Sequence, residues 1–197
     1  ELLTADQRAE FVKIPDEMSK QELETYYTFS QFDMEIIKRH RRDHNRLGFA
    51  VQLCVLRYPG WSLTDVEPIP DYVLHYIAKQ INANPDSFSL YAQRDPTKHE
   101  HMEEIRQVYG YQNFSVSTYR ELAQYLLKHA LQNGNSMYLL RTVQEELRNR
   151  KIVLPGMTTI ERVVWDTRRI ADAMIFNSLT ATLSPWQSTT LDNLIDP

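Results

Sequence analysis

Cysteine and glycine are both scarce in this sequence of 197 residues. Cys54 is the only cysteine, so the chain cannot form a disulfide framework or a cysteine metal cluster within itself. Only five glycines are present, and runs that alternate between apolar and polar residues are hard to find. Apolar residues recur instead at helical spacing. We therefore predict an all-α fold, and the single cysteine fits a cytoplasmic protein.

Long apolar runs and an excess of positive charge are also lacking. No run approaches the roughly 20 apolar residues that a membrane span needs, and no charged start precedes an apolar segment as in a secretory signal. These absences predict a soluble protein with no membrane partner. The formal net charge is −4, which argues against a uniformly basic nucleic-acid coat. Any DNA site must therefore be local.

Motifs that indicate catalysis are missing as well. There is no glycine-rich phosphate loop and no motif for a serine or cysteine nucleophile. His99 and His101 flank Glu100, but residues two apart point to different sides of a helix, and no third ligand is spaced to complete a metal site. We expect no catalytic residue, no metal site and no cofactor in this chain.

Breaks in the apolar pattern divide the chain into three expected domains. Residues 45–56 are apolar nearly all round a helix, as is typical of a helix enclosed by neighbours. Residues 82–85 interrupt the pattern, and so do residues 152–156. After the second break, apolar residues keep helical phase for about six turns. We predict a first helical DNA-binding domain over residues 1–84, a second over residues 85–155, and a long linking helix within residues 156–197.

A basic run over residues 38–46 is the strongest local feature. Five cations against one carboxylate give it a net charge of +4, enough to neutralise several phosphates, and arginine and asparagine also suit guanine and adenine edges. The run lies at the junction of two expected helices. The other interpretation is a solvated helix face whose arginines pair with acids elsewhere. The residues that we expect to contact DNA here are Lys38, Arg39, Arg41, Arg42, His44, Asn45 and Arg46.

A second candidate spans residues 98–120. A helix, a turn and a further helix would suit a helix-turn-helix reader, and helix N-termini bind phosphate readily. Three glutamates between residues 100 and 104 nearly cancel the basic residues, and many helix pairs with short turns belong only to a core. The candidate DNA contacts in this segment are Lys98, His99, Arg106, Tyr111, Ser115 and Arg120.

Residues 43–60, which read DHNRLGFAVQLCVLRYPG, closely resemble the signature of the N-terminal region of Tn3-family transposases. Shorter matches keep the order expected for that family at residues 26–30, 101–114, 152–155 and 159–162. The resemblance covers nearly the whole chain.

The resemblance implies a much larger intact protein in the bacterial cytoplasm. It would be a DDE/D transposase that uses Mg²⁺ to nick transposon ends and join them to target DNA in replicative transposition. Its metal-binding acids would lie beyond Pro197. This chain would supply helical DNA-binding domains of the helix-turn-helix, centromere-protein-B-like kind. It would bind double-stranded DNA of the terminal inverted repeats without being an enzyme itself.

A helical protein-interaction module is the alternative interpretation. The net negative charge favours it, and the apolar stripe of the expected helix over residues 159–183 would suit a protein partner or a homodimer of the full-length protein. Such a module would bind little DNA at moderate salt. A DNA-binding module would instead lose affinity steeply as salt rises.

Overall fold

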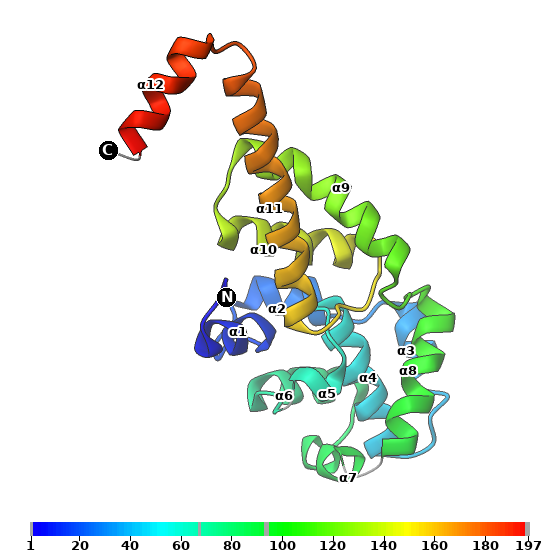
Figure 1. The fold of residues 1–197 in the computed structure, drawn as a ribbon. Coiled ribbons are helices and arrows are strands. Elements are labelled where there is room, and N and C mark those ends of the chain that lie inside the picture. The colour runs from blue at the N-terminus through cyan, green and yellow to red at the C-terminus, as the bar shows by residue number, and fades with distance from the viewer. Residues whose placement is uncertain (1, 67, 93–94, 196–197) are drawn as a thin grey trace. The chain divides into compact units, whose positions relative to one another are not determined.

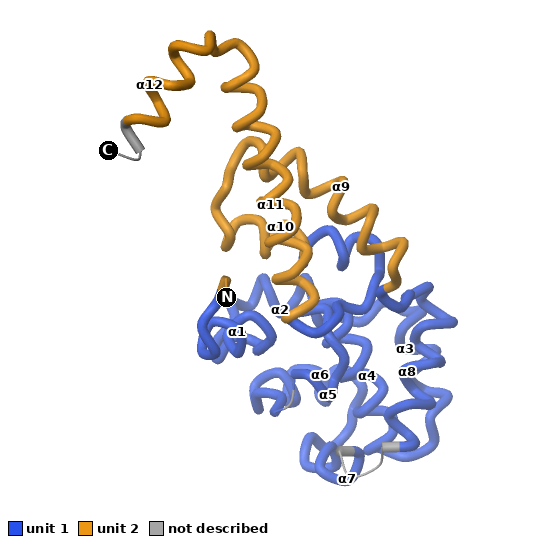
Figure 2. Tube along the Cα trace, viewed as in Figure 1, with its two compact units in different colours: residues 1, 3–114, 144–157 blue, residues 2, 115–143, 158–197 orange. Residues whose placement is uncertain are grey.

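The computed structural model describes residues 2–66, 68–92 and 95–195, and the regular structure of these residues is helical, without strands. The predicted all-α fold is confirmed. No described helix is both long and apolar enough to cross a membrane. Figure 2 shows that the chain divides into two compact units. Among the described residues, the larger unit comprises 3–114 and 144–157, and the smaller comprises 115–143 and 158–195 together with Leu2.

The larger unit is built mainly from the first eight α-helices of Figure 1. Its helices are α1 (Ala5–Val12), α2 (Lys20–Tyr27), α3 (Gln31–Ile37), α4 (Asp43–Arg57), α5 (Leu63–Val66), α6 (Asp71–Ile81), the 3-10 helix η1 (Pro85–Ser87), α7 (Phe88–Ala92), α8 (Asp95–Tyr109) and the second half of α10 (Ser136–Asn149).

Side-chain caps start the first three helices. Thr4, Ser19 and Ser30 each accept a hydrogen bond from the backbone amide three residues later, and the side chain at that later position accepts a hydrogen bond from the backbone amide of the cap residue. This reciprocal arrangement satisfies amides that a helix start leaves unpaired.

Helix α4 is the centre of the larger unit. Helices α2, α3, α5, α6, α7 and α8 pack against it, and its residues 47–56 are all buried, so the prediction of an enclosed helix is confirmed. At Gly48 the helix approaches α7 so closely that a Cβ atom would lie 2.2 Å from Cγ of Tyr91. The missing side chain of Gly48 therefore makes room for the Tyr91 ring.

Residues 144–157 belong to the larger unit because several hydrogen bonds tie them to it. The backbone amide of Leu154 donates to the carbonyl of Gly60 over 3.0 Å, and Nε1 of Trp61 donates to the carbonyl of Pro155 over 3.1 Å. An isolated parallel bridge joins Gln112 to Ile152. These bonds hold the segment that follows α10 beside the end of α4.

The smaller unit contains the long helix that the sequence predicts. Its helices are α9 (Val116–Gln132), the first half of α10, α11 (Met157–Thr180) and α12 (Pro185–Ile195). Leu122 and Leu126 of α9 are buried, as are Val163 and Val164 of α11. Side chains 172–179 of α11 are all exposed, so the core of this unit lies against the first half of α11.

The units have different limits from the predicted domains. The Gln52 side chain on α4 donates to the Tyr91 hydroxyl over 2.8 Å and to the carbonyl of Lys98 over 3.0 Å. Helices α7 and α8 therefore pack into the same core as α4. In the sequence, the break in the apolar pattern at residues 82–85 separates them from α6. Domains ending at residues 84 and 155 stay a prediction about the organisation of the protein.

Candidate nucleic-acid interface

The first five residues of the basic run, 38–42, form the turn between α3 and α4. Lys38 is the C-cap of α3 and Arg42 is the N-cap of α4. On either side the chain is fixed by buried apolar residues, Ile36 and Ile37 before the turn and Leu47 after it. Four cations of this turn are exposed, and among the described residues none of them pairs with a carboxylate. They are Lys38, Arg39, Arg41 and Arg42.

His40 is the one residue of the turn whose side chain packs against the core. Its ring centroid lies 4.4 Å from that of Phe49 and 4.5 Å from that of His101, and its Nε2 atom lies 3.6 Å from a carboxylate oxygen of Glu104. Burial lowers the pKa of His40, although Glu104 opposes this shift. The ring is therefore uncharged at neutral pH and holds the turn by packing.

His101 completes this buried aromatic cluster. It is 5% exposed, and its Nδ1 atom lies 3.0 Å from the Tyr91 hydroxyl. Burial, together with the neighbouring His40, lowers the pKa of His101 to about 4. The turn is thus attached to the core through neutral rings, while its cations point outside.

The start of α4 has no side-chain cap. Arg42 occupies the N-cap position without making a cap hydrogen bond, whereas α1, α2 and α3 all have capping boxes. Uncapped amides and the helix dipole both favour an anion at this position. The exposed cations of the turn immediately precede this helix start in the chain, which makes it suited to a phosphate group.

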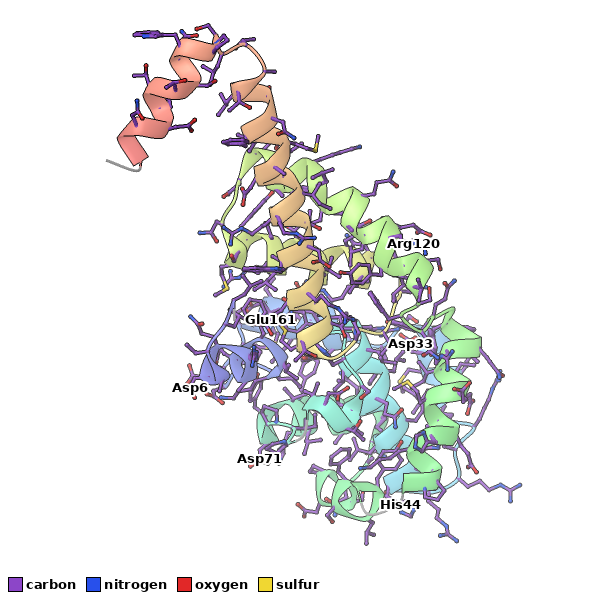
Figure 3. The ribbon with its side chains drawn as sticks, viewed as in Figure 1. Asp6, Asp33, His44, Asp71, Arg120 and Glu161 are labelled. Carbon is purple, nitrogen blue, oxygen red and sulfur yellow. The ribbon has the colours of Figure 1, made fainter. Side chains whose placement is uncertain are left out.

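The predicted contacts His44, Asn45 and Arg46 lie in the first turns of α4 and are half-buried. Figure 3 labels His44 at the beginning of this helix. Arg46 forms an ion pair with Asp43 one turn earlier, so its charge is partly balanced. The structure thus brings all seven predicted residues of the basic run together, with the turn more exposed than the helix start.

Three residues of the second predicted set lie on α8, in the larger unit. His99 is exposed, but Lys98 is only 8% exposed, and Arg106 pairs with Glu103 one turn earlier. The burial of Lys98 follows from the close approach of α8 to Gln52 of α4, which the sequence pattern did not reveal. Of these three side chains, His99 is the most accessible to a ligand.

The other three residues of that set are divided between the two units. Tyr111 is half-buried in the larger unit. Ser115 caps α9 in the smaller unit by accepting a hydrogen bond from the amide of Thr118, and Arg120 is exposed on α9, where Figure 3 labels it. The helix pair predicted over residues 98–120 therefore contributes one helix to each unit.

Residues 2–167 match the family described as Domain of unknown function (DUF4158). The chain belongs to the DUF4158 family. Its relatives include the transposase for transposon Tn1546 of Enterococcus faecium, 46% identical over 195 residues, the transposase for transposon Tn501 of Pseudomonas aeruginosa, 34% identical over 194 residues, and the transposase for transposon Tn21 of Escherichia coli, 35% identical over 195 residues.

These three alignments cover 98–99% of the DUF4158 chain but only 19–20% of each transposase. The chain therefore spans about a fifth of the length of these relatives. The predicted relation to the N-terminal region of Tn3-family transposases is confirmed.

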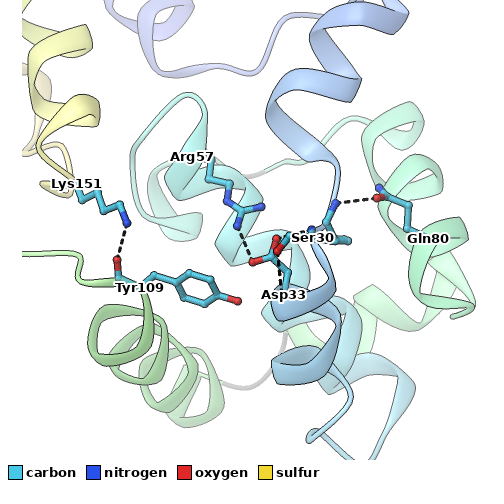
Figure 4. A network of polar contacts seen from close by, with 7 residues as sticks. Ser30, Asp33, Arg57, Gln80, Tyr109 and Lys151 are labelled. Atoms are coloured by element: carbon cyan, nitrogen blue, oxygen red, sulfur yellow. Dashed lines mark hydrogen bonds and ion pairs between the residues drawn. The ribbon is translucent and has the colours of Figure 1, made fainter.

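A partly buried ion pair in the DUF4158 chain joins α3 to the end of α4 that is farther from the basic turn. Figure 4 shows Arg57, at the end of α4, donating to Asp33 of α3 over 2.7 Å, while the amide of Ser30 donates to the other carboxylate oxygen over 2.8 Å. Burial alone would raise the pKa of Asp33, but these bonds hold it below its usual value. The pair fixes α3 to α4 and thereby positions both ends of the turn.

A pocket of about 480 Å³ lies in the same unit, beside Arg57. It combines aromatic and basic side chains from α2, α4, α8, α10 and the loops that follow α8 and α10. Its main lining residues are Tyr26, Arg57, Tyr109, Tyr111, Arg148 and Lys151. Of these residues only Tyr111 is a contact predicted from the sequence, because the others are far apart in the chain and share no motif. Among the described residues, no group of three potential ligands could hold a metal ion.

Proposed function

We propose that this chain recognises the terminal inverted repeats of a Tn3-family transposon, as the N-terminal DNA-binding part of a transposase that acts in replicative transposition. The observation that supports this most is the turn at residues 38–42, where four exposed cations precede the uncapped start of α4. The named transposases among its relatives indicate that the intact protein acts on DNA.

In this proposal the turn binds the DNA backbone first. Lys38, Arg39, Arg41 and Arg42 neutralise phosphates, and the backbone amides at the start of α4 donate hydrogen bonds to one phosphate oxygen. His44 and Asn45 then lie in the first turn of the helix, the part of a recognition helix that meets base edges in helix-turn-helix proteins. Phosphate contacts set the register, and these two side chains supply discrimination between bases.

The second predicted set of residues contributes less to DNA binding in this proposal. His99, Ser115 and Arg120 are the accessible members, and they supply further backbone contacts. Lys98 is buried and Arg106 is paired, so each contributes mainly through the packing of α8. The three glutamates between residues 100 and 104 make the contact of His99 with phosphate weaker than those of the turn.

In this proposal the catalytic residues of the intact protein lie outside this chain. Because the chain corresponds to about a fifth of its relatives, we propose that the DDE/D acids and their Mg²⁺ lie in the remaining part. This chain then has no catalytic step of its own. Its contribution is to select the transposon ends and to position them.

The test is binding of the chain to a labelled duplex with the terminal inverted repeat of its own element, compared with a scrambled duplex, by fluorescence anisotropy. We expect the repeat to be preferred, and Arg41→Ala and Arg42→Ala each to weaken binding several-fold, since each removes a phosphate contact. Lys20→Ala is the matched control, because Lys20 is an exposed cation on α2 that pairs with Glu24. Equal binding to both duplexes, or an equal loss in the control, would contradict the proposal.

One observation favours the alternative of a protein-interaction face. On the second half of α11, Ile175, Phe176 and Leu179 are 40%, 64% and 69% exposed, and such adjacent apolar side chains are typical of contact surfaces. A homodimer of the full-length protein through this face is the second candidate function. Sedimentation of the intact protein with Phe176→Asp and Leu179→Asp would test it, with loss of the dimer as the expected result.

A further inference from the structure

We infer that the pocket beside Arg57 binds a single nucleotide, with the base against its tyrosines and the phosphate against Lys151 and Arg148. The nucleotide is either free in solution or an unpaired nucleotide of a DNA strand, because both sources offer the same aromatic base and the same phosphate. The inference does not depend on the basic turn, which lies at the opposite end of α4 from Arg57.

The size and the aromatic lining of the pocket suit a base. Its volume of about 480 Å³ lies within the range of about 300–1,000 Å³ typical of small-molecule sites. Tyr26, Tyr109 and Tyr111 line it, and Tyr109 and Tyr111 are both half-buried. Tyrosine rings stack on the flat face of any base with little preference for its identity. Three tyrosines in one pocket are therefore a platform for a planar aromatic ligand.

The charge of the pocket is opposite to that of the chain. The lining contains three cations, Arg57, Arg148 and Lys151, and one carboxylate, Glu145. Its net charge is therefore +2. Asp33, paired with Arg57 from behind, reduces the local sum to +1. The chain as a whole is at −4. A positive pocket in an acidic protein selects an anion, and Glu145 offers an acceptor for an amino group of the base.

Lys151 has an unusual backbone conformation for a lysine. Its φ angle is +53°, and two backbone bonds, Lys151 to Arg148 and Ile152 to Leu147, both of 2.9 Å, end α10 in the manner that favours glycine at this position. Lys151 thus has a backbone conformation that is disfavoured for a lysine. Figure 4 shows its ammonium donating to the carbonyl of Tyr109 over 3.0 Å. Because an ammonium has three donors, two remain for a phosphate.

The walls of the pocket are fixed before a ligand arrives. The amide of Gln112 donates to the carbonyl of Lys151, and the amide of Val153 donates to the carbonyl of Gln112, both over 2.9 Å. These bonds hold Tyr111 beside Lys151. Arg148 lies 5.2 Å from the ring centre of Tyr58 and donates to the carbonyl of Pro59 over 3.4 Å. A site with ordered walls loses little entropy on binding.

The experiment measures binding of 2′-deoxyadenosine 5′-monophosphate by isothermal titration calorimetry, with ribose 5-phosphate as the probe that lacks a base. The main variant is Lys151→Gly, which removes the ammonium while supplying the residue that its backbone conformation favours, so it is expected to stay folded. Tyr111→Leu removes a ring, and Tyr111→Phe keeps it. Lys79→Gln, at an exposed position on α6, controls for net charge.

A second arm distinguishes the two sources of nucleotide. A duplex with one unpaired adenine is compared with the same duplex fully paired, by fluorescence anisotropy, for the original chain and for Lys151→Gly. A preference of tenfold or more for the unpaired adenine, lost in Lys151→Gly, assigns the pocket to a nucleotide of DNA. Binding of the mononucleotide without such a preference assigns it to a free nucleotide.

In the calorimetric arm we expect the mononucleotide to bind at least tenfold more tightly than ribose 5-phosphate. Lys151→Gly and Tyr111→Leu should each weaken it about tenfold, and Tyr111→Phe and Lys79→Gln should leave it unchanged. The inference is overturned if neither the mononucleotide nor the unpaired adenine shows a preference that depends on Lys151 in folded protein. Arg42→Ala should impair binding of the inverted repeat without affecting the mononucleotide, so the two proposals can fail separately.

Discussion

Replacing Gly48 by alanine would test how α4 is packed. The new Cβ atom would lie 2.2 Å from Cγ of Tyr91 and 2.3 Å from both of its Cδ atoms. Ordinary contact begins at 3.4 Å, so the two helices would have to separate locally by about 1.2 Å. Tyr91 is fully buried, and its hydroxyl is bonded to Gln52 and to His101. The ring therefore cannot move without loosening these bonds.

The expected effect is the difference between two opposing contributions. Overpacking of a buried site destabilises by about 1–3 kcal/mol, and a clash with a fixed ring belongs at the upper end of that range. Glycine to alanine within a helix stabilises by about 1 kcal/mol. We expect Gly48→Ala to lower the free energy of unfolding by about 2 kcal/mol.

Urea unfolding followed by circular dichroism measures this change. Gly156→Ala is the control in the same unit, because no atom lies within 4 Å of its added Cβ, and its midpoint should stay close to that of the original chain. In a Tyr91→Leu background the penalty of Gly48→Ala should shrink, since the ring that clashes is gone. An unchanged or higher midpoint for Gly48→Ala alone would refute the packing described for α4 and α7.

Three further predictions concern buried charge, a buried histidine and a strained backbone. Arg57→Met should lower the free energy of unfolding by about 3 kcal/mol near neutral pH, because it leaves the buried Asp33 carboxylate without its partner, and this loss should shrink in urea titrations toward pH 4, where that carboxylate can be protonated. Burial holds the pKa of His101 at about 4, below the 6.5 of an unperturbed histidine, so the unfolded chain binds the proton first as the pH falls. Stability should therefore drop by up to about 3 kcal/mol between pH 7 and pH 4 through this group, and His101→Gln should remove that part of the pH dependence; an identical profile would exclude this assignment. Lys151→Gly should raise the thermal midpoint, with a gain of up to about 1 kcal/mol, and a lower midpoint would mean that the bond from Lys151 to Tyr109 outweighs the backbone strain.

The helices and their starts could be predicted from the sequence because local chemistry determines them. Thr4 and Ser30 cap helices as their spacing from a polar side chain three residues later predicts. The nearly continuous apolar surface of residues 45–56 predicts an enclosed helix, and residues 47–56 are buried. The exposure of the basic run over residues 38–46 follows from the same reasoning, since five cations in nine residues cannot all enter a core.

The limits of the compact units could not be predicted, because they depend on which helices pack together. The bonds from Gln52 to Tyr91 and to Lys98 join segments that a clear break separates in sequence. A period of 3.6 residues shows that a helix has a buried face, but it does not show which helix covers that face. The same contacts bury Lys98, which the sequence pattern left as a candidate for DNA contact.

The pocket residues were also beyond sequence reasoning. Tyr26, Tyr109 and Lys151 meet only in the folded unit, and no motif connects them. One indication was present, since a lysine follows α10 at a position where glycine is usual. That indication has meaning only when the φ angle of Lys151 is known.

The salt dependence of binding to the terminal inverted repeat tests the central claim most directly. For a protein that contacts DNA phosphates, the logarithm of the binding constant falls linearly with the logarithm of the salt concentration, with a slope of about −0.9 per phosphate neutralised. If the turn between α3 and α4 binds phosphates of the DNA backbone, Arg41→Gln combined with Arg42→Gln should make the slope less steep by about 2. An unchanged slope in the folded double variant would contradict the claim that this turn holds transposon ends.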